Sequence, residues 1–147
     1  MSNLVCSKDV CCIKFDSICN NGCADAICFY SEVRGDCPSL YIKGNNFGIF
    51  EIKDSISKIG KGIQQINYTC NNFPSMAFLG QHSQSIKRKI IFIEINGQTG
   101  KKIANRLDQN LIRGLHTNNI EIFSKEDIIK FKKVHFKRQL QIARYLK

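Results

Sequence analysis

FGIFEIKDSISKIGKGIQQINY, residues 47–68, changes its hydrophobic period in the middle, and this change decides the fold. The first seven residues form an apolar run that carries Glu51 and Lys53 two positions apart, so that in a β-strand both side chains point to one face. From Ile56 onward, isoleucines recur at three- and four-residue steps, as they do on one face of a helix. The stretch therefore predicts a strand followed at once by a helix that packs on the same sheet.

The segments on either side extend this pattern into one domain of 147 residues, a length that suits a single hydrophobic core. Strand-like runs separated by turns predict an antiparallel meander in the first fifty residues. Later we expect strands at 75–80, 87–95 and 120–123, a helix from about Thr99 that extends to Leu115 and that Gly114 helps to end, and one or two basic amphipathic helices within 127–147. This order predicts an α/β or α+β fold with a mixed β-sheet flanked by helices.

Positive charge is concentrated in the second part of the chain. Residues 1–86 hold seven Lys or Arg and seven Asp or Glu, whereas residues 87–147 hold fifteen and five. Lysine and arginine gain affinity for polyanions by displacing counterions, so we expect a nucleic-acid phosphate backbone as partner, with a solvated basic surface as the alternative. The candidate contacts are Lys87, Arg88, Lys89, Lys130, Lys132, Lys133, Lys137, Arg138 and Arg144.

Targeting signals are missing from the sequence pattern. No stretch approaches eighteen consecutive apolar residues, and the first twelve residues lack the basic start and apolar run of a signal peptide. We therefore expect an intracellular protein, cytoplasmic or nuclear, that is neither secreted nor inserted in a membrane. A homodimer is compatible with these patterns.

All eight cysteines lie in the first 70 residues, and no two of them have CxxC spacing. The nearest approach to a zinc site is Cys19 with Cys23, which have three residues between them, together with Cys6, Cys11 or Cys12. Buried free thiols and disulfides are the two alternatives, and disulfides would suit an oxidising compartment.

The Glu51–Lys53 pair also has a chemical interpretation. A carboxylate can hold Mg²⁺ or Mn²⁺, and a neighbouring lysine can orient or deprotonate the water that attacks a phosphodiester. The second carboxylate would come from Asp25 or from Asp36. The alternative is an exposed ion pair that contributes less than about 1 kcal/mol.

Three short motifs occur in the order that is typical of one nuclease superfamily. GCADAI at 22–27, FEIK at 50–53 and Gln64 with Tyr68 on the following helix resemble the motifs of the PD-(D/E)xK nucleases, especially the RecB-like branch. The resemblance implies a restriction-endonuclease-like core in which Asp25 or Asp36 and Glu51 bind Mg²⁺ or Mn²⁺. It implies that Lys53 assists the attacking water, while Gln64 and Tyr68 support the substrate and the lysine.

The resemblance makes a metal-dependent nuclease the leading hypothesis, with DNA as the first substrate and RNA as the second. One rival is a non-catalytic nucleic-acid or ribonucleoprotein binder with the same fold, or with a cysteine-bound zinc. Another is an interaction protein that docks a partner through its terminal amphipathic helix.

Overall fold

A computed structural model of the chain describes residues 4–7, 10–15, 22–32, 41–42, 47–72, 86–131 and 134–147. Its strands form one mixed sheet with the order β1-β2-β3-β5-β6-β7, and β4 pairs with β3 beside this path. The predicted α/β class with a mixed sheet is confirmed. The strands are β1 (Leu4–Ser7), β2 (Val10–Lys14), β3 (Ala26–Glu32), β4 (Tyr41–Ile42), β5 (Phe47–Lys53), β6 (Ile86–Ile93) and β7 (Ile120–Ser124).

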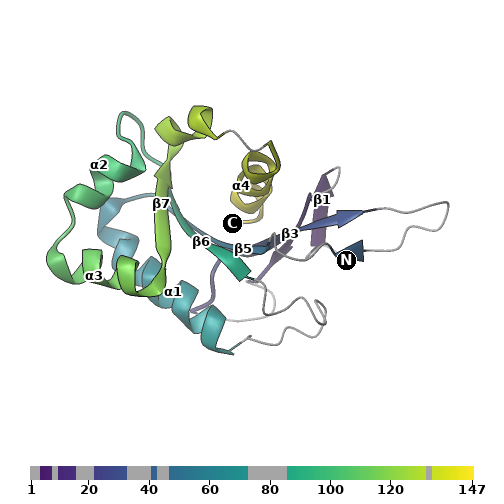
Figure 1. Cartoon of the computed structure of the whole chain (residues 1–147), viewed down its shortest axis with the longest axis horizontal. Coiled ribbons are helices and arrows are strands. Elements are labelled where there is room, and N and C mark those ends of the chain that lie inside the picture. Colours follow the sequence, from purple (N-terminus) through teal and green to yellow (C-terminus); the bar gives the residue numbers. More distant parts are fainter. Residues whose placement is uncertain are drawn as a thin grey trace.

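Helices cover both faces of the sheet (Figure 1). One face carries α1, α2 and α3, and the other carries α4. None of the described helices has the length and apolar character needed to cross a membrane. The helical elements are the 3₁₀ turn η1 (Ile56–Lys58), α1 (Ile59–Asn72), α2 (Gly100–Asn105), α3 (Gln109–Asn118), the 3₁₀ segment η3 (Lys125–Lys130) and α4 (Val134–Leu146).

Strand direction determines which chain segments meet. The pairs β1–β2, β2–β3 and β3–β5 are antiparallel, as the predicted meander requires, whereas β5, β6 and β7 are parallel. The carboxyl ends of the three parallel strands therefore lie at the same end of the sheet. Because Ala26 pairs with Phe50, the start of β3 lies next to the end of β5 at this end of the sheet.

Side chains of β5 alternate between two hydrophobic cores. Ile49 belongs to the core under α1, whereas Phe50 and Ile52 belong to the core under α4. Glu51 and Lys53 share the α1 side with Ile49, and both are buried, with relative exposures of 1% and 8%. The alternative of an exposed ion pair is wrong, because helices cover both faces of this strand.

The single helix expected from Thr99 is in fact two. The side chain of Asp108 accepts a hydrogen bond from the backbone N–H of Leu111 at 2.9 Å, so that Asp108 caps a new helix, α3. Gly114 lies inside α3 and does not end it. The helix ends at Asn119, whose left-handed backbone (φ 56°) forms the C-cap.

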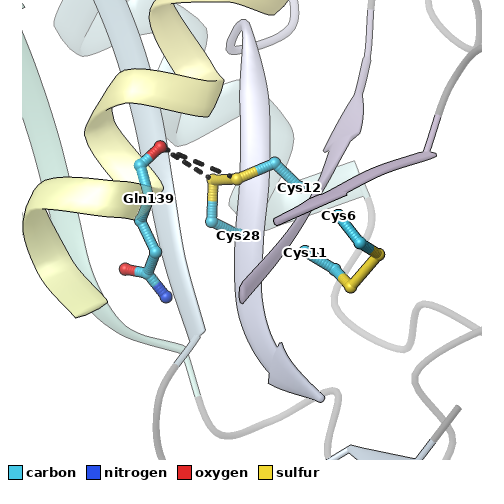
Figure 2. The surroundings of a disulfide bond; sticks show 5 residues. All are labelled: Cys6, Cys11, Cys12, Cys28 and Gln139. Atoms are coloured by element: carbon cyan, nitrogen blue, oxygen red, sulfur yellow. Dashed lines mark hydrogen bonds between the residues drawn. A yellow bond between two sulfur atoms is a disulfide. The ribbon is translucent and has the colours of Figure 1, made fainter. Parts of the chain in front are cut away.

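Two disulfides join the first three strands (Figure 2). Cys6–Cys11 connects β1 to β2, and Cys12–Cys28 connects β2 to β3. Each bond joins directly opposed residues of an antiparallel pair. Since neighbouring residues of a strand point to opposite faces, Cys11 lies in the core under α1 and Cys12 in the core under α4.

The Cys12–Cys28 disulfide also contacts α4. The Sγ atoms of Cys12 and Cys28 lie 3.7 and 3.6 Å from the carbonyl oxygen of Gln139, the contacts dashed in Figure 2. Disulfide sulfurs carry no proton, so these contacts become hydrogen bonds only when the cysteines are thiols. The oxidised bond thus packs α4 against β2 and β3 without donating to it.

Candidate acid–lysine site

Two carboxyl groups meet where β3 begins and β5 ends. Asp25 directly precedes β3, and Glu51 lies in β5. The backbone N–H of Asp25 donates to Glu51 Oε1 at 2.9 Å, and the N–H of Ile52 donates to Asp25 Oδ2 at 2.7 Å. These crossed bonds hold each acid against the backbone of the other strand. The structure therefore brings together Asp25, Glu51 and Lys53, three of the residues predicted as catalytic.

The charges of this cluster are closely coupled. Lys53 Nζ lies 2.9 Å from Glu51 Oε2, and Asp25 is 9% exposed. Burial raises the pKa of Glu51 to about 8, and the charge of Asp25 and its hydrogen bond add to the rise, while Lys53 opposes it. With both acids ionised, the two carboxylates and Lys53 would carry a net negative charge, which a proton on Glu51 or a bound cation would balance.

Helix α1 covers the site from one side. A Cβ at Gly62 would lie 3.5 Å from Lys53 Cε, so the lysine stem passes directly under this glycine. Near the other end of the helix, Thr69 Oγ1 accepts a hydrogen bond from the N–H of Ala24 at 2.7 Å. The segment that precedes Asp25 is thereby attached to α1.

Gln64 and Tyr68, the residues predicted to support the site, differ in what they contact. Gln64 is exposed on α1, on the side of the helix away from the buried isoleucines. Tyr68 is 45% exposed, and its ring lies 3.9 Å from the position of a Cβ at Gly22, three residues before Asp25. Thus Tyr68 contacts the segment leading to the site, and Gln64 does not face the core.

Gln65 is a polar residue that the sequence prediction missed. It lies one turn from Gly62 and one turn from Thr69 on α1, and it is half-buried. Its Oε1 is buried and has no hydrogen-bond partner. An unsatisfied buried acceptor between the residues that contact Lys53 and Ala24 can accept a hydrogen bond from a group entering the site.

The donor set fits a hard divalent cation. No group of three or more His, Cys, Asp or Glu side chains suited to a metal occurs in the described part of the chain. Mg²⁺, however, is commonly held by one or two carboxylates together with waters and substrate phosphates. Asp25 and Glu51 supply two carboxylates, and the carbonyl of Ile52 lies on the same edge of β5 as the Asp25 carboxylate. Carboxylate, carbonyl and water are the ligands that suit Mg²⁺ and Mn²⁺.

Comparison of the chain with protein-family models, with curated proteins and with solved structures gave no match. The chemistry of the site is therefore inferred from its geometry.

Several predicted residues lie outside the part of the chain that the structure describes. Asp36, the alternative second acid, lies outside the described residues, as do Cys19, Lys132 and Lys133. The backbone of Lys87 belongs to β6, but its side chain is not described. Asp25 is thus the acid that the structure places against Glu51.

The cysteines proposed as zinc ligands are engaged elsewhere. Cys6, Cys11, Cys12 and Cys23 are disulfide-bonded, and zinc binds thiolates. Of the two alternatives to zinc, this arrangement corresponds to disulfides, while Cys70 is a free thiol.

Several of the predicted basic contacts have partners within the protein. Arg88 Nη1 lies 4.0 Å from Glu121 Oε1, and the Arg88 guanidinium stacks over the Phe136 ring. Lys89 Nζ donates to the carbonyl of Asn118 at 3.2 Å. Lys130 is exposed, and Lys137 and Arg138 are half-buried on α4.

Arg144 lies near the end of α4. Its Nη2 lies 3.4 Å from Glu94 Oε2, and its guanidinium stacks over the Phe92 ring. The last turn of α4 is thereby held at the carboxyl end of β6.

A cavity of about 360 Å³ lies between α2, α3 and β7. Neither acid of the site nor Lys53 lines it, since it borders β7, which is separated from β5 by β6. Its lining includes Ala104, Leu115, Ile122 and Asp127. The cavity is therefore separate from the acid–lysine site.

Proposed function

We propose that the chain is a metal-dependent nuclease that hydrolyses phosphodiester bonds of DNA, with RNA as the second candidate substrate. The observation that supports this function is the buried cluster of Asp25, Glu51 and Lys53 at the end of β5. Isolated sequence motifs arise by chance, but here residues 26 positions apart lie in one hydrogen-bonded group. This arrangement also supports the resemblance to the PD-(D/E)xK nucleases.

Each residue of the site would have a separate role in phosphodiester hydrolysis. Asp25 and Glu51 would hold Mg²⁺ or Mn²⁺, which supplies Lewis acidity toward a phosphate oxygen and the attacking water. Lys53 Nζ, held 2.9 Å from Glu51, would orient the water and, in its neutral form, would accept the proton that the water releases. Gln65 Oε1 would accept a hydrogen bond from the water or from Lys53.

Phosphate contacts would come from the basic second part of the chain, residues 87–147, as its excess of Lys and Arg predicts. If about five phosphates are neutralised, log K for duplex binding should fall with log salt with a slope of about −4 to −5. Replacing Lys132, Lys133, Lys137 and Arg138 with alanine should flatten this slope by several units and weaken all sequences alike.

The deciding experiment measures cleavage of a plasmid and of a labelled oligonucleotide with Mg²⁺ or Mn²⁺. Asp25→Asn and Glu51→Gln should abolish cleavage, and Lys53→Met should slow it by about 10²- to 10⁴-fold. Glu121→Gln, which removes an exposed acid of β7, is the matched control and should cut normally.

Binding should be measured on the same variants in the absence of cutting. We expect each site variant to bind duplex within a few-fold of the wild type, since phosphate contacts lie outside the acid cluster. Binding without any Glu51-dependent cleavage would favour the non-catalytic nucleic-acid binder. Cleavage that persists in both acid variants would rule the proposed site out.

A further inference from the structure

Lys147, the residue after α4, approaches the acid–lysine site from the opposite face of the sheet. Figure 1 marks the C-terminal end beside β5. The ammonium Nζ of Lys147 donates to the carbonyl oxygen of Ile52 at 2.7 Å. The preceding residue, Leu146, is 5% exposed in the core under α4, and Arg144 is held by Glu94. The lysine is thus presented by an anchored helix end.

Ile52 connects this lysine to the acid pair. Its N–H donates to Asp25 Oδ2, and its carbonyl accepts from Lys147. In a strand, the N–H and the C=O of one residue point to the same side, so the Asp25 carboxylate and the Lys147 ammonium bind the same edge of β5. The lysine therefore lies where positive charge is attracted and where a carbonyl oxygen is available to a cation.

We propose that Lys147 is a tethered competitor of the divalent cation: it occupies the Ile52 carbonyl in the metal-free protein and releases it when metal binds Asp25 and Glu51. This regulation rests on the proposed function, because it concerns the same site. Two effects oppose metal binding while the lysine is in place. The carbonyl is already engaged, and a positive charge repels another across a short distance.

The effect of Lys147 on metal affinity depends on the fraction of molecules in which the Ile52 carbonyl is not occupied by the lysine. Apparent affinity is reduced by the fraction of molecules in which the site is open. If Lys147 occupies the carbonyl in about nine molecules of ten, the apparent dissociation constant rises about tenfold. Screening by salt at this exposed residue reduces the repulsive part and leaves the competition for the carbonyl.

The test measures Mn²⁺ binding directly, by electron paramagnetic resonance of free Mn²⁺ and by calorimetry, without nucleic acid. Lys147→Met removes the charge and keeps the length of the side chain, and Lys147→Arg keeps the charge. Arg113→Met, which removes one exposed cation from α3, controls for net charge. Thermal unfolding of each variant without metal confirms that the fold is intact.

We expect Lys147→Met to bind Mn²⁺ about tenfold more tightly than the wild type, while Lys147→Arg and Arg113→Met stay within about twofold of the wild type. An unchanged or weaker affinity in Lys147→Met, with binding still abolished by Glu51→Gln, would overturn the role of Lys147 and leave the metal site standing. Wild-type protein that binds no Mn²⁺ in a Glu51-dependent way would overturn the metal site and the proposed nuclease together.

Discussion

Glu51→Gln should gain stability relative to the wild type as the pH rises, although it removes one side of an ion pair. The glutamine keeps the shape of the side chain and removes its charge. Burial raises the pKa of Glu51 to about 8 in the folded protein, with a further contribution from Asp25, whereas the ordinary value is 4.5. The folded state therefore retains a proton that the unfolded chain releases between these two pH values.

The sign and the size of this change in the free energy of unfolding follow from proton linkage. A raised pKa in the fold contributes stability that is fully present below pH 4.5 and is lost as the pH rises through about 8. Between about pH 5.5 and about pH 8.5 the loss amounts to roughly 3 kcal/mol for the wild type. Glu51→Gln lacks this titration, so its stability relative to the wild type should rise by the same amount over that interval. Asp25 and Lys53 are the charged groups that face Glu51 in the described site, and both remain in the variant.

Urea unfolding of both proteins across this pH range measures the difference. For a urea m-value of about 1–3 kcal/mol/M, the midpoint gap between variant and wild type should widen by about 1–3 M. Added Mg²⁺ at about pH 8.5 should stabilise the wild type and leave Glu51→Gln unchanged, since a ligand stabilises only the state that binds it. Parallel stability curves for the two proteins would refute the description of Glu51 as a buried acid with a raised pKa.

Three further predictions concern stability alone, each checked by chemical unfolding under matched conditions. Thr69→Val should cost about 1–3 kcal/mol, because it leaves the buried N–H of Ala24 without its acceptor; Thr69→Ser should recover most of the loss. Gly114→Ala should stabilise by about 0.5–1 kcal/mol, because a Cβ there makes only ordinary contacts inside α3, and destabilisation would contradict this. Combined Cys12→Ala and Cys28→Ala should cost about 3 kcal/mol, the value for a loop of this length; reducing agent should then have a smaller effect on the variant than on the wild type.

The strand and the helix of residues 47–68 could be predicted because each has a regular period. Alternation placed Glu51 and Lys53 on one face of β5, which the structure confirms. The burial of that face could not be predicted, since it depends on α1 packing over the strand. The contact between Asp25 and Glu51 depends on the register of β3 against β5, and a sequence pattern does not specify register between distant strands.

Helix α1 shows how a signal can be present and still be missed. Ile59, Ile63 and Ile66 are buried, and their spacing defines the inner face of the helix. This phase alone places Gln64 on the outer side and Thr69 on the buried side. The QxxxY motif matches residue types only, and it therefore points to Gln64. The positions of the buried isoleucines around the helix axis point instead to the neighbouring Gln65 as the glutamine nearer the sheet. The break between α2 and α3 was missed for a related reason, because a continuous apolar period hid the N-cap at Asp108.

The burial of Glu51 bears on function because it is unfavourable for stability. At neutral pH the folded protein either retains a proton on this acid or buries two carboxylates beside one lysine. Replacing a buried ion pair with apolar residues of similar volume is often neutral or stabilising, and isoleucines already surround this position on β5 and β6. A strand that served only to build the core would gain stability from an apolar side chain here. The metal site proposed above supplies a reason for the acid, because the buried carboxylates would then bind the cation that balances their charge.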